Sequence, residues 1–217
     1  MAQQAREGFD PKDYEAPAIA GPFQGAAFDV VAMAASAGGI AALGEVLTGL
    51  PSDFRASIVV VQHLDPRHRS LMADILRRQT GLEVVQAREG QRIVPGSVYI
   101  APPDRHLLVN PDGTLALSQS ELVHFVRPSA DLLFESVAAC YKDRAIAVVL
   151  SGTGSDGSMG TRAIKKMGGT VIVQDQKSAE FAGMPQAAIN SGSADFVLPL
   201  DEIASALVTL VMKGMVE

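Results

Sequence analysis

The stretch that decides the fold runs from residue 28 to residue 50 and reads FDVVAMAASAGGIAALGEVLTGL. Its apolar run 30–34 has the length and composition of a strand that is buried on both faces of a sheet. Beyond a turn of small residues, apolar side chains recur with the spacing of one helix face, at Ile40, Leu43, Val46, Leu47 and Leu50. The stretch therefore predicts a buried strand, a tight turn and a helix.

Ser36 lies in this turn, at the carboxyl end of the strand and the start of the helix. A helix start offers unpaired N–H groups and positive potential, and the small neighbours leave room around the hydroxyl. Nucleophilic serines of hydrolases often lie in such a turn between a strand and a helix. The simpler alternative is a serine N-cap on a glycine turn.

Composition and charge narrow the classes of protein. The chain has 217 residues, 47% of them hydrophobic, which suits one domain with a sizeable core. A formal net charge of -6 argues against a nucleic-acid binder. The single cysteine, Cys140, excludes an intrachain disulfide and a thiolate zinc cluster, and it suits the cytoplasm. Because no membrane-length apolar run and no signal peptide are present, we expect a cytoplasmic protein without membrane insertion.

The order of patterns along the chain predicts the fold class. Residues 1–26 lack periodicity and read as a flexible tail or linker, so the domain is expected at 27–217. Buried strand patterns at 57–61 and 145–150 are each followed by a helical pattern. Three short strand-like runs in 96–118 are expected to form an antiparallel insertion. We predict an α/β fold with a doubly wound, mostly parallel sheet and a small antiparallel hairpin insertion.

Three residues with useful chemistry follow strand patterns: Ser36, His63 and Asp156. Ligands of open parallel sheets bind beyond the carboxyl ends of the strands, so these side chains are expected in one crevice. Taken singly, His63 also fits a hydrogen-bonded strand-end histidine, and Asp156 also fits an N-cap in a glycine-rich turn. Together they supply a nucleophile, a base and an orienting carboxylate. Their order along the chain, Ser–His–Asp, is not that of an α/β-hydrolase.

The sequence resembles the catalytic domain of the CheB family, the chemotaxis protein-glutamate methylesterases. The motifs that carry the resemblance are spread over about residues 28–210: AASAGG at 34–39, QH at 62–63, PGSVYIAP at 95–102, RPSADLLF at 127–134, GTGSDG at 152–157 and GMPQAAI at 183–189. The chain departs from the family pattern at three motif positions. Ala34 replaces the usual glycine, Ala37 the usual threonine, and Thr153 the usual methionine.

The resemblance implies roles for individual residues. Ser36 would be the nucleophile, His63 the general base and Asp156 the residue that orients it. The backbone N–H of Thr153 would donate to the oxyanion, a role that does not depend on the side chain. Arg127 would either contact the substrate or pair locally.

The resemblance also implies an activity, namely hydrolysis of glutamyl methyl esters on chemoreceptors or related signalling proteins, and some members also deamidate glutamines. No metal, organic cofactor or nucleic acid is expected. Family members usually carry an N-terminal receiver domain, which we expect to be absent because only some 27 residues precede the catalytic pattern.

Two other functions remain open from the sequence. The first is a CheB-like signalling or scaffold module with weak or no esterase activity, against which the intact Ser–His–Asp set argues. The second is a nucleotide-binding domain, which lacks support because no G-x-G-x-x-G follows the first strand and no Gly-Lys-Ser/Thr element is present. A positive cluster at 67–69 and 77–78 reads either as solvated surface or as a basic rim that steers glutamate-rich receptor helices.

Overall fold

The computed structural model describes residues 21–64 and 70–212. Strands and helices alternate along most of this range. In chain order they are β1 (Val30–Ala35), α1 (Gly39–Thr48), β2 (Ser57–Gln62), α2 (Met72–Arg77), β3 (Glu83–Gln86), β4 (Ser97–Ile100), β5 (His106–Val109), β6 (Leu115–Ser118), α3 (Ala130–Tyr141), η2 (Lys142–Arg144), β7 (Ala145–Val149), α4 (Ser158–Lys166), β8 (Thr170–Gln174), α5 (Gly183–Asn190), β9 (Phe196–Leu198) and α6 (Leu200–Met212).

A seven-stranded sheet in the order β3-β4-β2-β1-β7-β8-β9 forms the centre of the fold, and every neighbouring pair is parallel. Strand β1 is central, with Val30 opposite Ser57 of β2 and Ala145 of β7. All six residues of β1 are buried, which explains its continuous apolar run. The predicted doubly wound α/β fold is confirmed.

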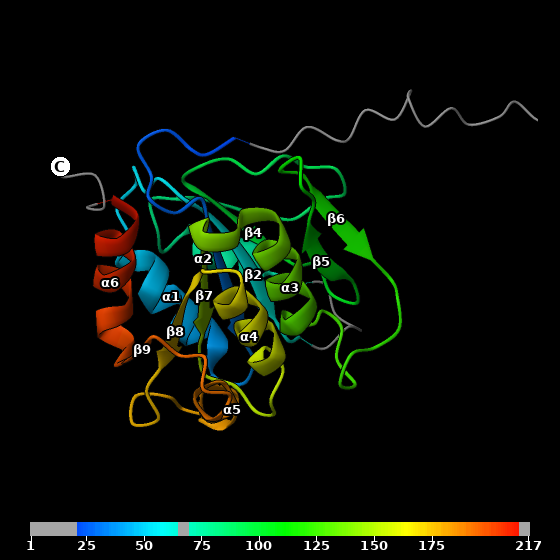
Figure 1. Cartoon of the computed structure of the whole chain (residues 1–217), viewed down its shortest axis with the longest axis vertical. Coiled ribbons are helices and arrows are strands. Elements are labelled where there is room, and N and C mark those ends of the chain that lie inside the picture. The colour runs from blue at the N-terminus through cyan, green and yellow to red at the C-terminus, as the bar shows by residue number, and fades with distance from the viewer. Residues whose placement is uncertain (1–20, 65–69, 213–217) are drawn as a thin grey trace, which may run out of the picture.

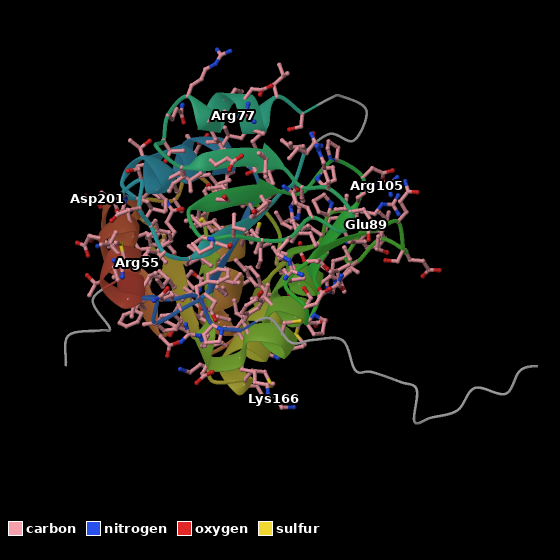
Figure 2. The ribbon with its side chains drawn as sticks, turned by 90° about the horizontal axis from the view of Figure 1, so that it is seen from above. Arg55, Arg77, Glu89, Arg105, Lys166 and Asp201 are labelled. Atoms are coloured by element: carbon pink, nitrogen blue, oxygen red, sulfur yellow. The ribbon has the colours of Figure 1, made fainter. Side chains whose placement is uncertain are left out.

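Helices cover both faces of the sheet (Figure 1). Val31, Met33 and Ala35 of β1 pack in the core that contains α1, α2 and α6, whereas alternate residues face the core of α3, α4 and α5. In the view from above, Arg77 on α2 and Lys166 on α4 lie on opposite sides of the strands (Figure 2). The period-two alternation of strand side chains thus divides one apolar strand between two cores.

The antiparallel insertion is smaller than expected. Only β5 and β6 pair in antiparallel fashion among the described strands, with Val109 opposite Leu115 across the predicted turn. The expectation for the first of the three runs was wrong, because β4 lies inside the parallel sheet between β3 and β2. Its four residues are all buried, as a strand with neighbours on both sides requires.

Local details of the first two helices differ from the sequence patterns. The N-cap of α1 is Gly38, with φ 72° and no side-chain cap, so Ser36 is not the N-cap of this helix. Ile40 lies in the first turn of α1 and is 37% exposed, whereas Leu43, Val46 and Leu47 are buried, so the inward face of the helix does not include Ile40. Helix α2 is short and buries Met72 and Leu76, which leaves Leu71 and Ile75 exposed.

Two expectations lie outside the described residues, namely the tail at 1–20 and the basic residues Arg67, His68 and Arg69. Within the described ranges, no helix combines the length and the apolar character that crossing a lipid bilayer would need.

Candidate active site

The strand order reverses at β1 and β7, and this point positions the candidate site. The helix after β1 covers one face of the sheet and the helix after β7 covers the other, which is the arrangement in which open parallel sheets bind their ligands. Three loops meet there: the turn after β1 with Ser36, the end of β2 with His63, and the loop 151–157 after β7. Two backbone hydrogen bonds hold the loops together, Ser36 N to Ser151 O at 3.0 Å and His63 N to Ala35 O at 3.1 Å.

His63 and Asp156 are in direct contact. The distance from His63 Nε2 to Asp156 Oδ2 is 2.9 Å, and the two side chains are only 15% and 5% exposed. The residues lie 93 positions apart in the sequence. The structure therefore brings together the imidazole and the carboxylate that the sequence analysis assigned to one crevice.

The Asp156 carboxylate sits on the N-terminus of α3. Its Oδ2 accepts from the backbone N–H of Ala130 at 2.6 Å, and its Oδ1 accepts from the N–H of Asp131 at 3.1 Å and from Ser129 Oγ at 2.9 Å. Asp156 thus accepts hydrogen bonds from backbone N–H groups at the start of α3. The alternative from the sequence, in which Asp156 is the N-cap of α4, was wrong, because that N-cap is Gly157.

This environment keeps Asp156 ionised. Burial acts to raise the pKa of the carboxyl, but the hydrogen bonds from His63, Ala130 and Asp131 outweigh burial and lower the pKa. The positive end of α3 acts in the same direction. An ionised carboxylate only accepts hydrogen bonds, so His63 Nε2 carries the proton in this pair. Nδ1 is then the nitrogen with a free lone pair.

Close packing of small residues fixes the Ser36 turn. Gln62 Nε2 donates to Ser36 O at 2.7 Å, and a Cβ on Gly39 would lie 2.3 Å from Gln62 Oε1. On the other side, a Cβ on Gly152 would lie 2.9 Å from the Cβ of Ser36 and 2.3 Å from Met184 Sδ. The glycines at 39 and 152 are therefore required by close approach to the serine turn.

Ser36 is half-buried, and its hydroxyl makes no hydrogen bond within the described part of the chain. Among the same residues, the backbone N–H of Thr153 has no acceptor in the protein, and Thr153 is exposed. The neighbouring Gly152 approaches Ser36 as described above. Thr153 thus follows directly on the glycine that packs against Ser36.

Arg127 borders the site but its donors are used locally. Nε and Nη2 donate to Asp104 Oδ1 at 2.9 and 2.6 Å, and Nη1 donates to the carbonyl oxygens of Gln119 and Ser120. Together with His63, Arg127 lines an open cleft of about 360 Å³. The structure thus shows the local pairing, and the side chain serves as a wall of the cleft.

Sequence reasoning missed three residues that hold the site. Gln62 anchors the serine turn, Ser129 Oγ donates to Asp156, and Ser151 Oγ donates to Ala37 O at 2.8 Å. The one available signal was a polar residue, Gln62, directly after the apolar run 58–61. Another histidine near the site, His106, has a structural role. It is fully buried, its Nε2 donates to Glu121 O, and its Nδ1 accepts from the backbone N–H of Ser129.

Comparison with known proteins agrees with this geometry. The family model described as CheB methylesterase matches residues 31–207. A Leptospira interrogans protein, named provisionally as a protein-glutamate methylesterase/protein-glutamine glutaminase, is 41% identical over 84% of this chain and 95% of its own length. A protein-glutamate methylesterase/protein-glutamine glutaminase of Pseudomonas fluorescens is 42% identical over 85% of this chain and 55% of its own length.

The crystal structure of the Thermotoga maritima CheB methylesterase catalytic domain superimposes with a TM-score of 0.82 at 38% sequence identity. The match covers 85% of this chain and 99% of that one. The chain spans nearly all of the Leptospira relative and about half of the Pseudomonas relative. By its sequence, its fold and the extent of these matches, the chain belongs to the CheB family as a protein-glutamate methylesterase/protein-glutamine glutaminase catalytic domain.

Proposed function

We propose that Ser36, His63 and Asp156 act as a catalytic triad on glutamyl methyl esters of chemoreceptors. The observation that carries the proposal is the 2.9 Å contact from His63 Nε2 to an ionised Asp156. His63 directly follows β2 and Ser36 directly follows β1, and these two strands are paired. Asp156 fixes the tautomer and orientation of His63 and stabilises the imidazolium that forms during the reaction.

In the first half of the reaction, Ser36 Oγ attacks the ester carbonyl while His63 Nδ1 takes the hydroxyl proton. The carbonyl oxygen becomes an oxyanion, and the N–H of Thr153 donates to it. The tetrahedral intermediate collapses, the C–O bond to the methoxy group breaks, and His63 returns the proton so that methanol leaves. A glutamyl ester of Ser36 remains.

In the second half, water attacks the acyl-enzyme while His63 again takes a proton, and the glutamate side chain is released with Ser36 restored. A glutamine side chain enters the same cycle with ammonia as the leaving group, which matches the glutaminase activity in the names of the relatives. These roles need no metal or organic cofactor.

We place this activity in the cytoplasm, on the chemoreceptors that the family name implies. The catalytic domain is proposed to comprise residues 27–217, with 1–26 as a tail or linker. Arg127 is proposed to shape the cleft beside His63 rather than to form an ion pair with the substrate, because Asp104 already occupies its guanidinium.

Release of methanol from a methylated receptor fragment tests the proposal. We expect the wild-type chain to release methanol and Ser36→Ala to lose at least about a thousandfold in rate with an unchanged melting temperature. Activity of Ser36→Ala within about tenfold of wild type would refute the nucleophile, and a wild type without activity would favour the scaffold alternative.

A further inference from the structure

A short hairpin beside the site carries an unusual side chain at its tip. Val123 and Val126 exchange two backbone hydrogen bonds, N to O at 3.2 and 2.9 Å, around His124 and Phe125. The φ values of the two tip residues are 49° and 66°, the left-handed signs of a type I′ turn. Asn-Gly or Asp-Gly normally occupies such a turn, because larger residues are strained there.

Phe125 combines this strained backbone with near-complete exposure. Its side chain is 94% exposed, and Leu122 at the base of the same hairpin is 53% exposed. A large apolar side chain gains nothing for folding in this position, since it is neither buried nor conformationally relaxed. Backbone outliers of this kind are concentrated at sites that bind ligands or partners.

The hairpin is held in place against the catalytic machinery. His124 Nε2 lies 3.7 Å from Asp131 Oδ2, a buried carboxylate oxygen with no hydrogen bond of its own in the described residues. The backbone N–H of Asp131 in turn donates to Asp156. At the other end of the hairpin, Arg127 binds Asp104 and the two carbonyl oxygens that precede the hairpin. The tip residue therefore projects from a fixed base.

Phe125 and Leu122 line the same cleft of about 360 Å³ as His63. His63 takes the Ser36 proton in the proposed mechanism, so a polypeptide that presents an esterified side chain to these two residues passes beside the cleft that His63 lines. We propose that Phe125, supported by Leu122, docks the substrate polypeptide by packing on an apolar side chain that neighbours the esterified glutamate. The occupant is thus the receptor segment itself, and the inference rests on the proposed methylesterase function.

The geometry separates docking from chemistry, because Phe125 belongs to the cleft wall and not to the His63–Asp156 pair. A receptor segment should use the contact, whereas a small neutral ester such as p-nitrophenyl acetate reaches Ser36 without it. Loss of Phe125 should therefore change KM for the protein substrate and leave the small ester unaffected.

The test measures methanol release from a methylated, soluble receptor fragment and hydrolysis of p-nitrophenyl acetate by the wild type and three variants. Phe125→Gly should raise KM for the receptor about tenfold with little change in kcat, while small-ester hydrolysis stays within about twofold. Its melting temperature should rise by about 2–4 °C, because glycine relieves the left-handed strain. Phe125→Leu should restore most of the affinity. Phe196→Ala removes another exposed aromatic, on the sheet edge strand β9, and should change neither substrate.

The outcomes separate the two levels of the proposal. A wild type that hydrolyses p-nitrophenyl acetate but not the methylated receptor refutes the proposed function. If the wild type is active on the receptor and Phe125→Gly keeps its KM, only the docking role is refuted. If Phe125→Gly lowers the rates on both substrates equally and also lowers the melting temperature, Phe125 has a structural role. If Phe125→Gly raises both rates equally, Phe125 covers the site. Either result overturns docking.

Discussion

Asp156→Asn changes one carboxylate oxygen to an NH₂ group and tests the centre of the proposed mechanism. Each oxygen of Asp156 accepts two hydrogen bonds, from His63 and Ala130 on one side and from Ser129 and Asp131 on the other. Whichever oxygen is replaced, the new NH₂ group faces at least one backbone N–H that cannot reverse its role. The variant therefore cannot satisfy the site in either amide orientation.

The expected loss of unfolding free energy follows from these bonds. Leaving a buried donor without an acceptor costs about 1–3 kcal/mol. Because the new NH₂ group and the backbone N–H that it faces are both donors, both lose a hydrogen bond. We expect the unfolding free energy of Asp156→Asn to be about 2–4 kcal/mol lower than that of the wild type. Asp74→Asn is the matched control, since Asp74 pairs with Arg77 at 3.1 Å while both side chains are about half exposed. That surface pair should contribute less than about 1 kcal/mol.

The pH dependence has a defined sign. The folded-state pKa of Asp156 lies below that of an unfolded aspartate, so its contribution to stability is complete above about pH 4 and is lost as the pH falls through the folded pKa. The difference in unfolding free energy between wild type and Asp156→Asn should therefore shrink below about pH 4. Urea unfolding at a series of pH values measures it.

Catalysis should fall further than stability. With the new amide nitrogen toward His63, the imidazole turns its unprotonated Nε2 to that NH₂ group and carries the proton on Nδ1, the nitrogen that has to accept the Ser36 proton. A wrong tautomer of this kind costs about 10⁴-fold in kcat in a serine protease triad. Methanol release under conditions where the variant is fully folded checks the value. A rate within about tenfold of wild type would refute the assigned role of Asp156.

Four further variants address other parts of the site. Thr153→Ala should retain the rate of methanol release, whereas Thr153→Pro, which removes the backbone N–H, should lose about 10²–10³-fold; equal rates for the two would exclude that N–H as oxyanion donor. Gly152→Ala places a Cβ against Met184 Sδ and the Ser36 Cβ, so we expect about 1–3 kcal/mol of destabilisation in urea melts and a lower kcat. Burial raises the pKa of Asp131, so ionisation destabilises the wild type as pH rises above about 4. Asp131→Asn should lack that decline when urea unfolding is measured at a series of pH values. If the wild type and Asp131→Asn show parallel profiles of unfolding free energy against pH, the raised pKa of Asp131 is contradicted.

The parallel sheet could be predicted because its signal is local. The six residues of β1 are apolar in sequence and buried in the fold, and the same holds for β7. Strand β4 was assigned to the wrong sheet because its four residues resemble those of the adjacent hairpin strands, and only its pairing with β2 and β3 distinguishes it. Local patterns predict a strand but not its partners.

The meeting of His63 with Asp156 could be predicted from the sequence, whereas the groups that hold this pair could not. Ser36 and His63 directly follow β1 and β2, Asp156 lies in the loop after β7, and parallel strands end at one edge of the sheet. The hydrogen bonds from Ser129, Ala130 and Asp131 to Asp156 could not be predicted, because they depend on how α3 approaches the loop after β7.

The wide sequence separation within the site has a consequence for folding kinetics. His63 and Asp156 meet across 93 positions, and their strands pair with β1 from opposite sides. Parallel pairings over such distances form slowly, because a long loop must close before any contact is gained. Esterase activity should therefore return at the end of refolding, together with the last loss of exposed apolar surface. Its return measures when pairing of the central strands is complete.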